Sequence, residues 1–298
     1  MAAFASTPGF VAALHSAARR RRWALTERSL AAPLGLFYLV FLFAPLAALF
    51  VVSLSVDRTF TRFGFSQYAT FFSERLNWAI LGETLELGLM CTLACLAFAY
   101  PLALVYARAP RRVRPLMLFL IVLPQLTSSV VRTFAWIVIL GREGVVDSTL
   151  LSLGLPRAGL LFTTPGVVVA LTQIQLPLMV LPLINAVIGL DPHLLEASQS
   201  LGAGAWRGFF RVILPLTAPA ATAGALLVFT AAISAFVTQS IVGGGRLVYM
   251  PKYIYDLSIG AQDWPFAAAA TMMLLAAALL AVAALSWLGG RAARRVQR

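Results

Sequence analysis

Charged residues are scarce in this chain. Asp, Glu, Lys and Arg make up 11% of its 298 residues, whereas 60% are hydrophobic and the mean hydropathy is +0.88. Because a soluble domain carries about 25% charged residues, this composition excludes one and predicts an all-α integral membrane protein with many spanning helices. The two cysteines, Cys91 and Cys95, lie one helical turn apart in an apolar run. They fit small core residues and not a zinc site.

Catalytic motifs are missing as well. The sequence contains no G-x-x-x-x-G-K-[ST], and its single lysine, Lys252, follows Met250 and Pro251, so the chain cannot cradle ATP phosphates in a P-loop. His15 and His193 are the only histidines, and neither H-E-x-x-H nor G-x-S-x-G occurs. This inventory argues against a membrane enzyme and predicts that the chain binds no cofactor and no metal of its own.

Six apolar runs are long enough to cross a membrane. Each is close to the roughly twenty residues that about 30 Å of hydrocarbon requires. They cover residues 31–55, 79–107, 116–140, 164–190, 216–242 and 265–288. Arg19 to Arg22 resemble the start of a signal peptide, but the first run exceeds the roughly 7 to 15 apolar residues of such a peptide. We therefore expect it to be retained as a membrane anchor.

Basic residues predict the orientation of these spans. Fifteen of the 23 Lys and Arg residues fall in the N-tail, the loops after the second and fourth spans, and the C-tail; seven fall on the other side and Arg132 lies within a span. The positive-inside rule then places both termini and the loop after the fourth span in the cytoplasm. The domains expected are a basic tail (1–30), a membrane domain (31–290) and a basic tail (291–298). The net charge of +12 follows from this topology and from lipid contact and needs no nucleic acid.

The loop at residues 191–215 is half polar and lies between two spans. Asp191 and Pro192 form a helix start, and Gly202 suits the left-handed position that ends a helix. A second short helix should then follow and end at Pro215. Its apolar face recurs at helical spacing in Trp206, Phe209, Phe210 and Ile213. Each helix has about ten residues, too few to span, so the pair is expected at the membrane surface.

This loop resembles the EAA loop in the permease subunits of binding-protein-dependent ABC importers, which reads E-A-A, three residues, G, nine residues, I-x-L-P. The chain reads Glu196-Ala197-Ser198, then Gly202, then Val212-Ile213-Leu214-Pro215, with Ser198 and Val212 as mild replacements. The resemblance implies a type I importer (MetI-like) permease fold with six spans and a cytoplasmic coupling helix that sits in a cleft of the ATP-hydrolysing subunit. The residues that it assigns to ATPase coupling are Glu196, Ala197, Ser198, Leu201, Gly202, Ala203, Trp206, Leu214 and Pro215.

The same resemblance implies a location in the bacterial inner membrane and a set of partners. A second permease subunit, two cytoplasmic ABC ATPases and a periplasmic solute-binding protein would complete the transporter, and ATP and Mg²⁺ would be used by the ATPases. The outer loops, residues 142–157 and 243–263, would meet the binding protein, although plain solvated connectors are the alternative.

More motifs point to a narrower branch. Residues 132–137, 141–144, 150–155, 243–245 and 263–266 look like the spermidine/putrescine branch of these permeases, specifically its B-type subunit. This resemblance implies a polyamine-type solute. The chain departs from the branch at Glu83-Thr84-Leu85, where Asn or Ser usually precedes Thr-Leu, so another amine or amino-acid-like solute stays open. An ion-coupled secondary transporter would need inverted repeats, and no convincing repeat is visible.

Polar groups within the spans are candidates for the solute path, because an ionisable side chain there costs roughly 2.5 to 3.5 kcal/mol. Glu83 and Glu86 share one helix face, and Arg132 lies at a similar depth in the third span. A structural Glu86–Arg132 ion pair, a carboxylate-lined passage for a cation, and interfacial snorkelling all remain open. Asp263 alternatively only starts a helix. The candidate path residues are Glu83, Glu86, Arg132, Trp136, Gln173, Gln175, Asp263 and Trp264.

Overall fold

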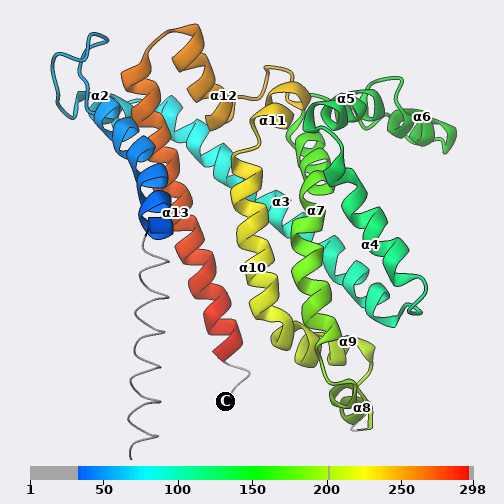
Figure 1. The fold of residues 1–298 in the computed structure, drawn as a ribbon. Helices are drawn as coiled ribbons and strands as arrows, with labels where there is room; N and C mark the ends of the chain where they lie inside the picture. The colour runs from blue at the N-terminus through cyan, green and yellow to red at the C-terminus, as the bar shows by residue number, and fades with distance from the viewer. Residues whose placement is uncertain (1–32, 201, 295–298) are drawn as a thin grey trace, which may run out of the picture.

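The computed structural model describes residues 33–200 and 202–294, which form helices joined by turns and loops (Figure 1). Among these residues there is no β-strand, only an isolated bridge between Ser55 and Phe63. The described part contains five helices that are long and apolar enough to cross a membrane. They are Pro33–Ser53, α3 (Arg75–Arg108), α7 (Thr164–Ile188), the helical run Trp206–Ile233 and α13 (Trp264–Arg294). The prediction of an all-α membrane protein is confirmed.

The third predicted span, residues 116–140, is not one continuous helix, and that prediction is wrong. α4 (Arg114–Val122) tightens into a 3₁₀ turn, and α5 (Ser129–Leu140) then leaves in a new direction, with a bend of 98° between the two helical parts. Pro124 lacks the N–H that a helix needs, and both the N–H and the hydroxyl of Thr127 donate to its carbonyl, at 3.3 and 2.8 Å. A sixth crossing exists only if this bent pair counts as one span.

The fifth predicted span, residues 216–242, is also interrupted. α10 (Leu214–Ile233) ends early, and α11 (Phe236–Val242) begins after two non-helical residues. The side-chain Nε2 of Gln239 donates to the carbonyl of Ala232 at 2.7 Å, and the N–H of Ala235 donates to the same carbonyl at 3.3 Å. The break is therefore a defined part of the fold, stabilised by the buried Gln239.

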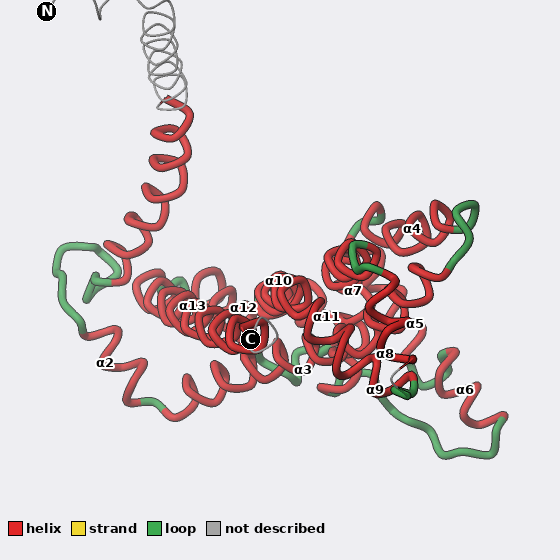
Figure 2. The backbone as a smooth tube through the Cα atoms, turned by 90° about the horizontal axis from the view of Figure 1, so that it is seen from below, coloured by secondary structure: helices red, strands yellow, loops and turns green. Residues whose placement is uncertain are grey.

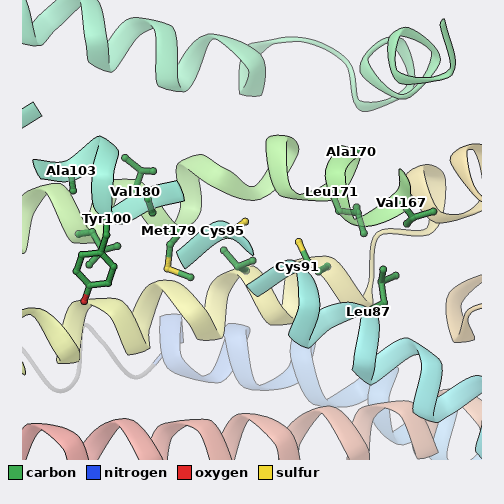
Figure 3. Close-up of a cluster of buried hydrophobic side chains, with 14 of the residues drawn as sticks. Leu87, Cys91, Cys95, Tyr100, Ala103, Val167, Ala170, Leu171, Met179 and Val180 are labelled. Carbon is green, nitrogen blue, oxygen red and sulfur yellow. The ribbon is translucent and has the colours of Figure 1, made fainter. Parts of the chain in front are cut away.

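The core lies where α3, α7 and α10 pack together. Figure 3 shows side chains of α3 facing those of α7, and among them are Cys91 and Cys95 of α3 and Met179 and Val180 of α7. All four are fully buried, and the two cysteines are free thiols. The thiol of Cys95 donates to the carbonyl of Thr172 at 3.5 Å. The prediction that the cysteines are small core residues is confirmed.

Two glycines allow these helices to approach closely. A Cβ added at Gly224 would lie 2.8 Å from Sδ and 3.2 Å from Cα of Met179 on α7, and one added at Gly88 would lie 2.5 Å from Cγ2 of Ile233 on α10. Small residues at such crossings let helix backbones pack without lipid between them.

Replacing Gly224 with Val is expected to lower the thermal unfolding midpoint of the protein in detergent. The added methyl groups have no room beside Met179, and overpacking of this kind costs about 1 to 3 kcal/mol. Gly82→Val is the matched control, because a Cβ at Gly82 on α3 meets no atom within 4 Å. Equal midpoints for the two variants would contradict the close contact.

The helices place their connections at two opposite ends (Figure 1). The turn between α3 and α4, the last turn of α13, and the two short helices α8 (Pro192–Ser200) and α9 (Ala205–Gly208) lie at the lower end. The upper end carries the other short helices. They are α2 (Ser66–Ser73), α5, α6 (Val145–Ser152), α11, α12 (Met250–Tyr255) and the π-helix Asp256–Gly260. The described Arg-rich connections therefore share one end, as the charge distribution predicted; the tail 1–30 lies outside the described residues.

The first helix, Pro33–Ser53, stands apart from the rest. Figure 2 shows it leaving the bundle of α3, α7, α10 and α13, and none of its most apolar window is buried against the chain. The other spans are buried to different extents, most of all α7. The core of the fold thus consists of the later helices.

Candidate functional site

Residues 191–215, termed here the coupling segment, begin with the capped helix α8. The N–H of His193 donates to Oδ1 of Asp191 at 3.0 Å, and Pro192 takes the first helical position, as predicted. Nδ1 of His193 lies 3.2 Å from Oε2 of Glu196, and the Glu196 side chain is 70% exposed. α8 therefore presents Glu196 outward from the chain.

Gly202 forms the hinge of the coupling segment. Its φ is +80°, and the N–H of Ala203 donates to the carbonyl of Ser198 at 3.0 Å, the bond that defines a Schellman turn after a helix. A Cβ at Gly202 would meet no atom within 4 Å, so the position demands glycine for its backbone conformation and not for space. The predicted helix stop is confirmed. Ala197 lies within α8, and Leu201 lies outside the described residues.

The second half of the coupling segment differs from the prediction. Pro215 does not end a short surface helix, because Trp206–Ile233 forms one helical run of 28 residues. A π-helix, Phe209–Ile213, precedes α10, and the N–H of Leu214 bonds to the carbonyl of Phe209, five residues back. A proline ring clashes with the carbonyl four residues earlier in an α-helix, and the wider π turn relieves this clash at Pro215. The hinge at Gly202 is thus joined directly to a membrane-spanning helix.

The aromatic face of this helix is divided. Trp206, 76% exposed, stacks on Phe210 with ring centroids 5.9 Å apart. Phe209 instead packs edge-on against Tyr100 of α3 at 5.3 Å, and Ile213 is buried. One part of the predicted apolar face therefore fixes the helix to α3, and the other part faces outward.

At the opposite end of α3, Glu83 and Glu86 are exposed and Thr84 between them is buried. The hydroxyl of Thr84 accepts the N–H of Met250 at 2.9 Å, which fastens the start of α12 to this part of α3. Burial raises the pKa of Tyr249, and the negative charges of Glu83 and Glu86 raise it further. The two carboxylates thus project from the chain's own bundle beside a neutral tyrosine.

Arg132 lies elsewhere, and the Glu86–Arg132 ion pair, one of the alternatives left open by the sequence, is not formed among the described residues. The bend before α5 carries Arg132 into a helix that lies across the upper end (Figure 1). Its Nη2 lies 3.4 Å from the hydroxyl of Ser129, while its Nε and Nη1 are shielded from solvent without a hydrogen-bond partner in the described part of the chain. α5 packs on α11, where the hydroxyls of Thr133 and Thr238 lie 3.1 Å apart.

Two other candidate path residues are brought together. Nε1 of Trp136 donates to Oε1 of Gln173 at 3.2 Å, which joins α5 to α7. Gln175 is 8% exposed within α7. Nearby, Nε2 of Gln125 donates to the carbonyl of Ile174 at 2.7 Å, which joins the turn after α4 to α7.

Asp263 and Trp264 lie at the start of α13. Oδ1 of Asp263 accepts the N–H of Phe266 at 3.2 Å, and its Oδ2 lies 3.6 Å from Nη2 of Arg58. Asp263 therefore caps the start of α13, and its expected place in the solute path stays a prediction. Trp264 is 52% exposed beside it.

Sequence reasoning missed two buried residues at this end of the molecule. Asp147, 2% exposed, accepts the N–H groups of Ala158 and Gly159 at 3.0 and 3.3 Å and so shapes the loop after α6. Tyr249 lies beside the carboxylates of α3. The available signal for Asp147 was that it is the single charged residue of α6. Nothing in the local sequence marks Tyr249. Within the described residues, no three His, Cys, Asp or Glu side chains are placed to hold a metal ion.

Comparisons with known proteins agree with this arrangement. The model of the family "Binding-protein-dependent transport system inner membrane component" matches residues 96–297. Over 201 residues the chain is 37% identical to the spermidine/putrescine transport system permease protein PotB of Escherichia coli K12, covering 67% of this chain and 73% of that protein. The molybdenum transport system permease protein ModB of Azotobacter vinelandii is 33% identical over 166 residues, which cover 56% of this chain and 73% of that one.

The fold is matched by a solved structure of a bacterial alginate ABC transporter in complex with an alginate pentasaccharide-bound periplasmic protein. The TM-score is 0.73 at 20% identity, and the match covers 92% of this chain and 96% of that chain. This likeness concerns the fold, because the sequences have diverged widely.

Proposed function

The chain belongs to the family of binding-protein-dependent transport system inner membrane components, with the fold of a type I ABC importer permease, and we propose how it works in such a transporter. The single observation that carries the proposal is the coupling segment: a capped helix, a glycine hinge, and a direct helical continuation into a span. In this proposal α8 docks in a cytoplasmic ATPase subunit and receives its motion.

The structure offers a path for that motion. The run Trp206–Ile233 would extend about 42 Å at 1.5 Å per residue, which is longer than the hydrocarbon core. Its α10 part packs closely on α7 at Gly224 and on α3 at Gly88. A displacement of α8 would therefore move α10 together with the helices packed on it. This motion would open a central passage to one side of the membrane and close it to the other. The chain itself performs no hydrolysis in this scheme; ATP and Mg²⁺ belong to the ATPases.

The proposed assembly contains this chain, a second permease, two ATPase subunits and a periplasmic binding protein. The alginate transporter that shares the fold was solved with such a periplasmic protein, which supports the last partner. The end that carries α8 and α9 would face the cytoplasm, where the ATPases lie, and both tails would be on the same side. The Arg-rich connections share that end, which agrees with the positive-inside rule. The opposite end would meet the binding protein.

The proposed solute is a small cation of the polyamine type, such as spermidine or putrescine. Two observations support it: a PotB relative of 37% identity carries that name, and two carboxylates project from the bundle near the outer end of α3. Negative side chains there would attract a cation and replace part of its hydration. Another amine or an amino-acid-like solute is the second candidate, because a permease with a different named solute, molybdenum, is also similar to this chain and Glu83 departs from the branch pattern.

Uptake into vesicles tests this function. We expect labelled spermidine to accumulate in vesicles that hold the complete complex and its binding protein when ATP is supplied on the ATPase side. Accumulation should persist after the proton gradient is collapsed, because ATP hydrolysis and not an ion gradient drives an importer of this type. Loss of uptake with ATP still present would favour a secondary transporter. ATP-driven uptake of a different amine, without spermidine uptake, would refute only the solute.

A further inference from the structure

A hollow of about 710 Å³ lies between the second half of α3 and the coupling segment. Its walls are mostly apolar side chains from these two parts of the chain. They include Leu93, Ala97, Pro101, Trp206, Phe209 and Phe210. Among the described residues that line the hollow, Arg108 carries the charge, and no Asp or Glu faces it. The hollow therefore combines an apolar body with one basic group.

Arg108 is free to bind a ligand. It is exposed and makes no hydrogen bond or ion pair with any other described residue. Arg114, by contrast, is occupied: its Nε and Nη2 donate to the carbonyls of Ala109 and Ala107 at 3.1 and 2.8 Å. More positive charge lies nearby in sequence, at Arg111 and Arg112 after α3. An anionic group at Arg108 would thus meet a positive field.

The hollow also has the length of one lipid leaflet. Leu93 and Arg108 are fifteen residues apart, about 22 Å along the helix, and a leaflet contributes about 15 Å of hydrocarbon. α3 runs obliquely across the bundle (Figure 1), so its depth in the membrane is less than its length. Arg108 would lie at the head-group level and Leu93 deep in the hydrocarbon. A cytoplasmic protein could cover the mouth of this hollow but could not fill its far end.

We propose that this hollow binds an anionic phospholipid of the inner leaflet, with an acyl chain along α3 and the phosphate on Arg108. The inference rests on the proposed function only for the side of the membrane that the coupling segment faces. Trp206 stands at the mouth, as amphipathic indoles do at membrane interfaces. The lipid would pack against the helix that follows the Gly202 hinge. The lipid composition of the membrane would therefore affect how motion passes from α8 to that helix.

The test measures lipid retained by the purified, assembled complex. The complex is washed in detergent, supplied with phosphatidylglycerol or phosphatidylcholine of identical chains, and the bound lipid is quantified by mass spectrometry. We expect the wild type to retain phosphatidylglycerol several-fold better than phosphatidylcholine. Arg108→Gln should remove this preference, because the phosphate loses its charged partner. Arg142→Gln, an exposed arginine at the opposite end, is the matched control and should retain the preference.

Ala97→Trp provides a second, independent variant. It fills the hollow and leaves Arg108 in place, so the retention of both lipids should fall. Equal retention of the two lipids by the wild type, an unchanged preference in Arg108→Gln, or no retained lipid because the second permease covers the hollow would each overturn the proposal. The assay uses neither ATP nor solute, so its outcome is separate from the uptake experiment.

Discussion

Replacing Gly202 with Asp is expected to reduce the recovery of the ATPase subunits with the membrane complex by about tenfold or more. Gly202 holds a φ of +80°, and a residue with a side chain pays about 1 to 2 kcal/mol in that left-handed region. The new carboxylate would also lie in the surface that docks. Relief of the strain would break the turn in which Ala203 donates to Ser198 and would turn α8 away. A pull-down through a tagged permease measures the recovery, and vesicle uptake should fall in parallel.

Glu196→Lys should have the same effect without backbone strain. Its side chain is exposed and its charge is reversed, while α8 keeps its cap at Asp191. Gly154→Asp is the matched control: Gly154 has a φ of +75°, and a Cβ there meets no atom within 4 Å, yet it follows α6 at the other end. It should recover the ATPases like the wild type. Wild-type recovery and uptake in both coupling variants, with normal insertion, would refute the docking role and the orientation that depends on it.

Most of the fold was predictable because it depends on composition along the chain. Hydropathy alone finds the long helices, since every backbone group in lipid must be paired within its own segment. Pro124 marks a bend, but the 98° size of the break after it was not predictable from the sequence, and neither was the break at residues 234–235, where the apolar composition continues. The two breaks are stabilised by particular hydrogen bonds, from Thr127 to Pro124 and from Gln239 to Ala232. Such bonds depend on how the chain turns in space and leave no hydropathy signal.

The candidate site was likewise predictable only in part from the sequence. Asp191 and Gly202 were found because helix caps use bonds between residues two to five positions apart. The ion pair between Glu86 and Arg132, one of the alternatives left open by the sequence, does not form among the described residues, because it required the third span to run straight. Pro215 was misread because a π turn, which the sequence does not mark, lets the helix continue through it. Local chemistry was thus readable from the sequence, and contacts between distant segments were not.

Neutralising both carboxylates on α3, Glu83→Gln with Glu86→Gln, is expected to slow cation uptake by about tenfold or more, since one charged hydrogen bond contributes about 1.5 to 3 kcal/mol. Both carboxylates are exposed on α3, while Thr84 between them is buried in the chain's own bundle. The two carboxylates therefore face a partner subunit, a passage or the lipid. The structure provides no arginine partner for them in the described part of the chain. A bound cation would supply the missing positive charge.

The initial rate of labelled spermidine uptake measures this effect, and ATP hydrolysis stimulated by the binding protein is measured beside it. Because the glutamines keep the shape of the side chains, hydrolysis should remain coupled to the binding protein while transport falls. Glu74→Gln is the matched control: Glu74 precedes α3 and its carboxylate accepts from Asn77 at 3.3 Å, outside the apolar run. Wild-type uptake by the double variant would show that the two carboxylates do not line the solute path. A fall in both uptake and stimulated hydrolysis would instead place Glu83 and Glu86 in contacts that hold the complex together.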